Sequence, residues 1–177
     1  DHQPAAGQVG PDVGRDEQIA RVYSDDWGVH SVGIRPGVVY GVGRDQGLTS
    51  TTTVAILAAA AGKSYTVPFA GGVSWLYGAE VASAFIRAVS RERAGAPVFE
   101  MNGVYAPVED GLRILKELAP SAAITCTGQP LAFPMHLPDT PLREFLGDYG
   151  TMPLADGIRQ TFDAFRALLK RGLVAAP

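Results

Sequence analysis

The stretch Val32-Gly-Ile-Arg-Pro-Gly-Val-Val-Tyr-Gly41 carries most of the information about the fold. Branched apolar residues predict a short strand over residues 29–34, and residues 37–40 continue as extended chain. Proline fixes one backbone angle and glycine permits a sharp change of direction, so Pro36 and Gly37 predict a turn. A glycine-rich loop over residues 41–47 follows. The stretch therefore predicts a strand, a turn and a loop in direct succession.

Outward from this stretch, helical and extended patterns alternate. Apolar residues at helical spacing predict helices over residues 15–26, 50–61, 81–89, 108–119 and 158–169. In the second of these helices the expected buried stripe is Val54, Leu57, Ala58 and Ala61. Short apolar runs predict strands over residues 64–69, 73–77, 97–101 and 122–127, and four prolines predict a loop over residues 128–141. The alternation predicts an α/β fold with a mainly parallel sheet and flanking helices.

The composition is that of one globular domain. Of the 177 residues, 46% are hydrophobic and 19% are charged, which favours a chain with a real core over a disordered one. We expect residues 1–14, rich in glycine, proline, glutamine and alanine, to be irregular, and residues 15–177 to form a single α/β domain. A net charge of −3 gives no reason to expect nucleic acid as a partner.

Several other classes of protein are disfavoured. The longest apolar run, residues 54–61, is too short to span a membrane, and the N-terminus has no signal-peptide pattern, so the expected compartment is the cytoplasm. The single cysteine, Cys126, cannot form an internal disulfide and is expected to be a buried strand residue. His2, His30 and His136 do not cluster in the sequence, and no metal site is predicted.

Three stretches resemble the extended short-chain dehydrogenase/reductase family, which contains NAD(P)-dependent epimerases and dehydratases. Residues 32–41 resemble its Arg-Pro-x-x-Val-Tyr-Gly strand and loop, residues 77–86 are similar to its Val-x-Asp-Val-Ala helix start, and residues 146–165 fit its C-terminal Leu-Gly…Pro…Gly-Ile-x-x-Thr pattern. The resemblance implies the substrate-side, C-terminal half of an incomplete Rossmann-like fold that lacks the N-terminal nucleotide-binding half.

The resemblance also implies a catalytic tyrosine and lysine four residues apart, on one face of a helix. The family often has a glutamate four residues after that lysine. If Glu17 is this glutamate, the lysine position is Val13 and the tyrosine position is Val9. Residues 1–22 contain no tyrosine and no lysine, so a small shift of the alignment does not restore the pair. We therefore expect no catalytic dyad in this chain.

Cofactor binding by this chain alone is not expected. The cluster Gly41-x-Gly43-x-x-x-Gly47 differs from the dinucleotide fingerprint, and no acidic residue follows at the distance needed for the ribose. In the parent family the cofactor is NAD or NADP, and Pro36, Gly37 and Val38 would border its nicotinamide only if the other half were supplied. The cluster is otherwise interpreted as a flexible loop at a substrate cleft.

Three residues are candidates for contact with a small-molecule substrate. Arg44 could hold a carboxylate or phosphate, and its alternative is a solvated loop charge. Trp75 and Tyr77 lie where nucleotide-sugar members carry an arginine, so a substrate wall here would suit an apolar or small neutral molecule, and their alternative is core packing.

Three hypotheses for function remain. The first is an NAD(P)-dependent epimerase/dehydratase-family protein or fragment that is redox-inactive on its own and forms a homodimer through the helix over residues 15–26. The second is a diverged non-redox protein that binds a ligand, or acts as an isomerase, cyclase or dehydratase. The third is a partner subunit of an intact paralogue.

Overall fold

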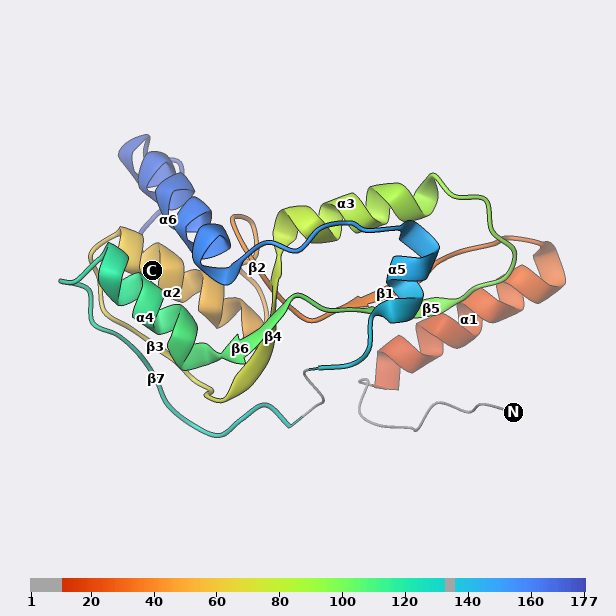
Figure 1. Ribbon diagram of the computed structural model, residues 1–177, viewed down its shortest axis with the longest axis horizontal. Helices are drawn as coiled ribbons and strands as arrows, with labels where there is room; N and C mark the ends of the chain where they lie inside the picture. The colour runs from red at the N-terminus through yellow and green to blue at the C-terminus, as the bar shows by residue number, and fades with distance from the viewer. Residues whose placement is uncertain (1–10, 133–135) are drawn as a thin grey trace.

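The computed structural model describes residues 11–132 and 136–177, with side chains described from residue 14 onwards. Its elements are α1 (Pro11–Trp27), β1 (Gly33–Pro36), β2 (Val38–Tyr40), η1 (Leu48–Ser50), α2 (Thr51–Ala60), β3 (Tyr65–Val67), β4 (Gly72–Tyr77), α3 (Gly78–Val89), β5 (Val98–Met101), β6 (Val104–Pro107), α4 (Val108–Leu118), β7 (Ile124–Cys126), α5 (Thr140–Leu146) and α6 (Leu154–Lys170). Figure 1 shows two lobes joined at β2, β4 and β6. The predicted α/β class is confirmed.

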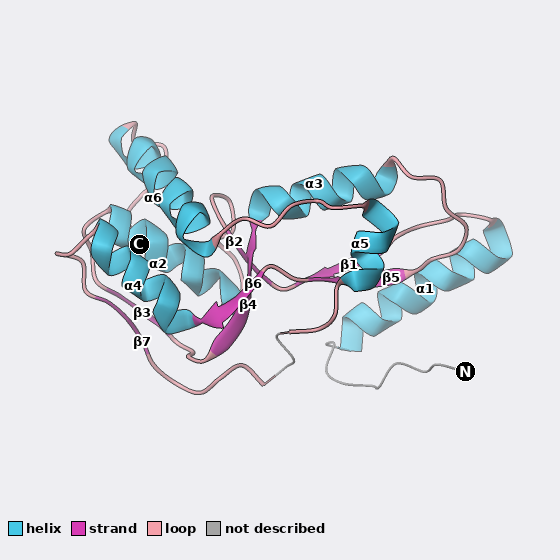
Figure 2. Cartoon of the chain, viewed as in Figure 1, coloured by secondary structure: helices cyan, strands magenta, loops and turns pink. Residues whose placement is uncertain are grey.

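The strands of the described residues form three small sheets. β1 pairs with β5, β2 with β4, and β3 with β7, all in parallel, whereas β6 joins β4 in the antiparallel direction. The pairing is therefore mainly parallel, as predicted. Figure 2 shows β1 and β5 in the lobe that carries α1, α3 and α5, whereas β3 and β7 lie with α2, α4 and α6.

Each lobe has its own hydrophobic core, and β4 contributes to both. Val73 and Trp75 belong to the larger core, which also contains residues of α2, α4 and α6. Leu76, between them and the end of the strand, belongs to the smaller core with residues of α3, β5 and α5. Successive side chains of a strand point to opposite faces, so one strand can serve two cores. β4 thereby fixes the position of one lobe against the other.

Helix α1 begins four residues earlier than predicted. Residues 11–14, expected to be irregular, are its first turn. The reason is the position of Pro11: proline lacks an N–H donor, but the first residues of a helix need no such donor, and proline's fixed backbone angle suits a helix start. Position 13, where the resemblance expects the lysine, is thus helical, whereas position 9 lies outside the described residues.

The buried face of α2 differs from the predicted stripe. Val54 and Leu57 are only half-buried. The buried residues are Thr52, Thr53, Ala55, Ile56, Ala58 and Ala59. These positions surround much of the helix, because α2 packs against α6, α4 and β3 together. A helix that is covered on several sides has no single apolar stripe for a pattern to reveal.

Two elements were not predicted, and one was displaced. β6 follows β5 after the short turn at Asn102 and Gly103, within a stretch too short to stand out as a separate strand. α5 begins inside the predicted proline-rich loop, because Pro141 lies in its first turn, where proline is tolerated. β1 starts at Gly33 and not at Val29, since Val29 instead bonds back to Tyr23 at the end of α1.

Candidate functional site

The carboxyl end of the β1–β5 pair is the first place to look for a site, because ligands of α/β proteins bind beyond the carboxyl ends of parallel strands. The chain leaves β1 at Pro36 and enters β2 at Val38, so Gly37 is the crossing point. A Cβ atom on Gly37 would lie 2.8 Å from both Cβ and Oγ of Ser74. Glycine is therefore required here, since β1 reaches β2 only by passing against the Ser74 side chain.

Ser74 and Tyr105 share one face of the β4–β6 ribbon. They are direct partners in the antiparallel register, and such partners point to the same side. Ser74 is fully buried, and its Oγ accepts a hydrogen bond of 2.9 Å from the backbone N–H of Gly103. Because Gly37 contacts Ser74 on this side, the same face borders the end of the β1–β5 pair. We call this face, with Gly37, Ser74, Tyr105 and His136, the carboxyl-edge face.

Tyr105 and His136 lie together on the carboxyl-edge face. Their ring centroids are 5.1 Å apart with the planes tilted by 51°. The Tyr105 ring leans over Gly72, where a Cβ atom would overlap the phenol oxygen, and yet Tyr105 is 53% exposed. A phenol and an imidazole are thus held side by side and open to solvent. Both groups can donate and accept hydrogen bonds.

Arg35 ties α1 to the β1–β5 pair. Its guanidinium donates to both carboxylate oxygens of Glu17, at 2.7 and 2.6 Å, and to Oε1 of Glu100 at 2.8 Å. The hydrogen bond to Glu17 is the largest cause that raises the pKa of Arg35, so this side chain is always charged. Glu17 is thereby fixed against the strand that carries the Arg-Pro sequence, and Val13 lies one helical turn before it.

The Gly41–Gly47 loop is closed on itself. The backbone N–H of Gly41 donates to Thr53 Oγ1 at 3.3 Å, that of Arg44 to the Gly41 carbonyl at 3.1 Å, and that of Ser50 to the Gly47 carbonyl at 3.1 Å. A pyrophosphate is held by backbone N–H groups that are not already bonded. The backbone N–H groups of Gly41 and Arg44 are therefore already bonded within the protein.

Arg44 lies within the same loop. Its guanidinium donates to the Gln46 carbonyl and, at 3.2 Å, to Thr49 Oγ1, and it lies beside Gly47. The loop is thus bridged by its own arginine. Binding of an anion by Arg44 would require these bonds to be exchanged for bonds to the ligand.

Trp75 and Tyr77 have different surroundings. Trp75 is 3% exposed and packs edge-on against Tyr40, with ring centroids 5.5 Å apart, while its other end lies against Gly111. Its indole is part of the larger core, so the core-packing alternative describes it. Tyr77 is partly buried, and its backbone N–H donates to Glu80 Oε2 at 3.0 Å at the start of α3. Neither residue lies on the carboxyl-edge face.

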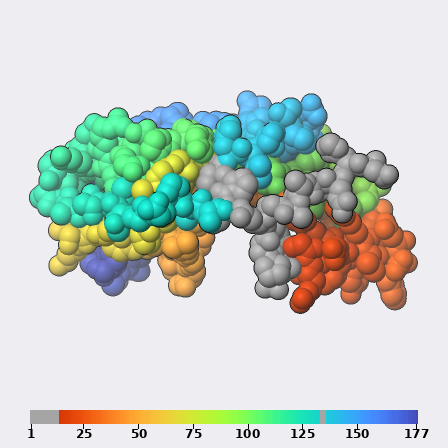
Figure 3. Space-filling view, turned by 90° about the horizontal axis from the view of Figure 1, so that it is seen from below, coloured from red at the N-terminus to blue at the C-terminus, as the bar shows by residue number. Residues whose placement is uncertain are grey.

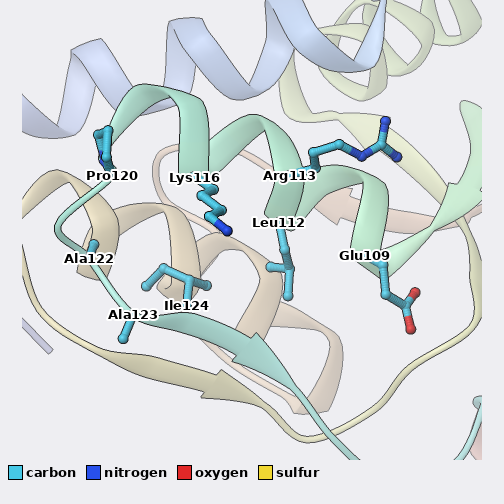
Figure 4. Close-up of a pocket in the computed structure, with 8 residues that line it drawn as sticks. All are labelled: Glu109, Leu112, Arg113, Lys116, Pro120, Ala122, Ala123 and Ile124. Carbon is cyan, nitrogen blue, oxygen red and sulfur yellow. The ribbon is translucent and has the colours of Figure 1, made fainter.

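A separate groove of about 410 Å³ lies between α4 and β7. Figure 4 shows Leu112 and Ile124 pointing into it from opposite sides, with Lys116 beside them and Glu109 at one end. Cys126, in β7, has its thiol pKa raised by burial and then by nearby Glu109. The thiol is therefore less easily ionised than an ordinary one. Among the described residues, no cluster of three or more potential metal ligands occurs.

The sequence pointed to part of this site. The predicted Pro36–Gly37 turn borders the carboxyl-edge face, whereas the predicted contact of Pro36, Gly37 and Val38 with a nicotinamide stays a prediction. Tyr105 was missed because β6 was missed, and His136 was weighed only against the other two histidines. The sequence did hold one signal for Tyr105, because this tyrosine comes just after the Asn102–Gly103 turn that follows β5.

Comparisons with protein-family models and with curated protein sequences find no match. Solved structures do match. A partial-consensus L-threonine 3-dehydrogenase superposes with a TM-score of 0.75 at 17% identity, over 86% of this chain and 53% of that one. The Thermus thermophilus UDP-glucose 4-epimerase in complex with NAD gives 0.70 at 21%, over 85% and 51%. The Thermotoga maritima UDP-glucose 4-epimerase with UDP-glucose gives 0.72 at 19%, over 88% and 52%.

At these identities the similarity concerns the fold. The chain spans about half the length of the solved structures that it matches. It therefore has the fold of part of an NAD-dependent epimerase or dehydrogenase of the extended short-chain type, as the three sequence stretches indicated.

Proposed function

We propose that this chain is the substrate-side half of an epimerase/dehydratase-type enzyme and has no redox activity alone. The observation that supports this most is the two-stranded β1–β5 sheet. β1 has a partner only on its β5 side among the described residues, and α1 and α3 lie on either side of this pair (Figure 1). Exposed apolar residues occur on α3: Phe85, Ile86 and Val89.

An open parallel edge near an exposed apolar helix face suits a further strand-and-helix layer. All-parallel sheets occur almost only with both faces covered, and an uncovered edge favours aggregation. We infer that a nucleotide-binding half from outside these 177 residues completes the sheet and supplies the NAD or NADP site. Pro36, Gly37 and Val38 would then border the nicotinamide. A nucleotide-binding half carried by another polypeptide would make this chain a partner subunit of an intact paralogue.

Calorimetric titration with NAD and with NADP tests this function. The isolated chain should show no binding up to millimolar cofactor, because the Gly41–Gly47 cluster lacks the spacing of the dinucleotide fingerprint. Binding in the micromolar range would contradict the proposal. Mass spectrometry of the native protein would show whether the nucleotide-binding half is on the same polypeptide or on another one.

The proposed substrate is a small polar molecule and not a nucleotide sugar. A diphosphate needs cationic partners, and the arginine nearest the crossing point, Arg35, is saturated by Glu17 and Glu100. Arg44 is held by its own loop. Of the ligands suggested by the fold neighbours, L-threonine fits this better than UDP-glucose. Calorimetric titrations with L-threonine, D-glucose and UDP-glucose would rank the affinities of the chain for the three compounds.

A homodimer through α1 is the second part of the proposal. The apolar residues of α1 form an exposed stripe at helical spacing, Ile19, Val22, Tyr23 and Trp27, whereas the side facing the chain carries Glu17 and Ser24. Figure 3 shows the atoms of α1, in red, at one end of the molecule. We expect a helix with its apolar side outward to be covered.

Charge along α1 favours a second copy as the cover. The helix has Arg15 near its start and Asp25 and Asp26 near its end. In an antiparallel pair centred between residues 20 and 21, Arg15 faces Asp26 of the partner and Ile19 faces its Val22. The Ile19–Val22 and Arg15–Asp26 pairs are therefore self-complementary across a two-fold interface, whereas Asp25 faces Asp16 of the partner.

Sedimentation analysis tests the dimer. The natural chain should be dimeric at micromolar concentration, and Val22→Asp should be monomeric. Val42→Asp is the matched control, because Val42 is equally exposed, at 50% against 53%, but lies in the Gly41–Gly47 loop. A monomeric natural chain, or a Val22→Asp dimer, would refute the interface.

The compartment proposed for the protein remains the cytoplasm. No helix in the described ranges is long and apolar enough to cross a membrane.

The alternative is a non-redox protein on the same scaffold, with isomerase, cyclase, dehydratase or ligand-binding function. One observation favours it: Tyr105 and His136 provide acid–base groups that are independent of the missing dyad.

A further inference from the structure

We propose that Tyr105 and His136 form a binding pair for a small hydroxyl- or carbonyl-bearing substrate at the carboxyl-edge face. This rests on the proposed function only for the class of substrate, because the geometry of the pair is independent of any cofactor half. Neither residue belongs to the helix that would carry the tyrosine–lysine dyad, and they come from β6 and from the segment before α5.

The position of Tyr105 is built into the fold. Its partner in the β4–β6 pair is Ser74, and the Ser74 side chain contacts Gly37, where the chain passes from β1 to β2. The phenol therefore lies on the side of the sheet where β1 ends. Gly72 leaves room for the phenol, since any larger residue there would overlap its oxygen. The ring is thus confined from below by backbone and from one side by His136, while its outer surface stays open.

The chemistry of the pair suits a neutral polar ligand. A phenol O–H can donate to a carbonyl or hydroxyl oxygen, and the imidazole beside it can accept from the ligand hydroxyl or donate to it. Two polar groups on rings that contact each other can orient a ligand as well as bind it, whereas a single exposed side chain cannot. The pair contacts uncharged hydroxyl or carbonyl groups of the ligand, and the nearby Arg35 is already bound by two carboxylates.

Calorimetry of three variants against the same panel of L-threonine, D-glucose and UDP-glucose tests the pair. Tyr105→Phe keeps the ring and removes the hydroxyl, and His136→Phe keeps an aromatic contact and removes both nitrogens. Each should weaken binding of the best compound about tenfold, the effect of one lost hydrogen bond of about 1.4 kcal/mol. Tyr65→Phe, in β3 and outside the carboxyl-edge face, is the control and should leave affinity unchanged.

The outcomes separate this inference from the proposed function. Unchanged affinity in both Tyr105→Phe and His136→Phe, with their circular dichroism spectra intact, would overturn the pair, and so would a natural chain that binds none of the three compounds. Micromolar NAD binding by the isolated chain would overturn the proposed function instead and would leave the pair standing. Gly72→Ala gives an independent check: it should displace the phenol and weaken binding as much as Tyr105→Phe does.

Discussion

Replacement of Glu17 by glutamine should release α1 from the rest of the chain. The Glu17 carboxylate makes both of its contacts to Arg35, at 2.7 and 2.6 Å, and the two side chains are 16% and 30% exposed. Exposed ion pairs contribute at most about 1 kcal/mol, whereas breaking a fully buried pair costs about 3–5 kcal/mol. For this half-buried pair we expect a loss of about 1–2 kcal/mol, which raises the opening of α1 by about 5–30-fold.

Amide hydrogen exchange measures this opening directly. In Glu17→Gln, protection over residues 18–27 should fall by about 5–30-fold, while β4, in the centre of the molecule, should keep its protection. Glu100→Gln is the matched control, because it removes the other carboxylate of Arg35 at 2.8 Å but leaves the contact to α1. If both variants reduce the protection of α1 equally, or neither does, Arg35 does not anchor the helix through Glu17.

Two further predictions concern the core and pH. Gly157→Ala should lower the free energy of unfolding, measured in urea, by about 1–2 kcal/mol, because its Cβ would overlap the buried Tyr40 hydroxyl. Gly14→Ala on α1 has open space around it and should raise the free energy of unfolding by about 0.5–1 kcal/mol. Equal effects of the two variants would contradict this prediction. Burial raises the pKa of Tyr40 and Tyr149 above the ordinary 10.0, so the folded chain holds these protons more tightly than the unfolded one. The resulting stability is complete below pH 10 and should fall as the pH rises above it, in urea midpoints measured from pH 8 to 11; a flat profile would contradict the role of the two phenols.

The succession of helices and parallel strands could be predicted from the sequence, because it depends on local periodicity. α3 and α6 have one covered side, and their apolar spacing was plain. α2 is covered on several sides, so its pattern gave the wrong stripe. Nothing local distinguishes Phe85 and Val89, which are exposed, from Ala84 and Ala88, which are buried. Exposure at those positions depends on which elements pack against α3 and not on the helix itself.

The candidate site was less predictable, because it depends on register. The Arg-Pro-Gly turn is a local signal and was found. The contact of Tyr105 with His136 joins β6 to a segment thirty residues later, and it follows only from the pairing of Ser74 with Tyr105 and from the missing side chain of Gly72. A sequence read alone has no means of bringing these residues together. Trp75 shows the converse, since its aromatic character suggested a substrate wall and its register places it in the core.

The contact that docks α1 also determines what chemistry the chain can perform. Because Glu17 is fixed to Arg35, α1 cannot rotate or slide without breaking both carboxylate bonds, and position 13, one turn before Glu17, is set. That position is a valine, which can carry neither a proton nor a charge. A proton transfer at the end of the β1–β5 pair therefore needs a group other than Val13. On the carboxyl-edge face, the exposed groups able to take that part are the phenol of Tyr105 and the imidazole of His136, which is why replacing them is the sharper test of whether this chain retains a function of its own.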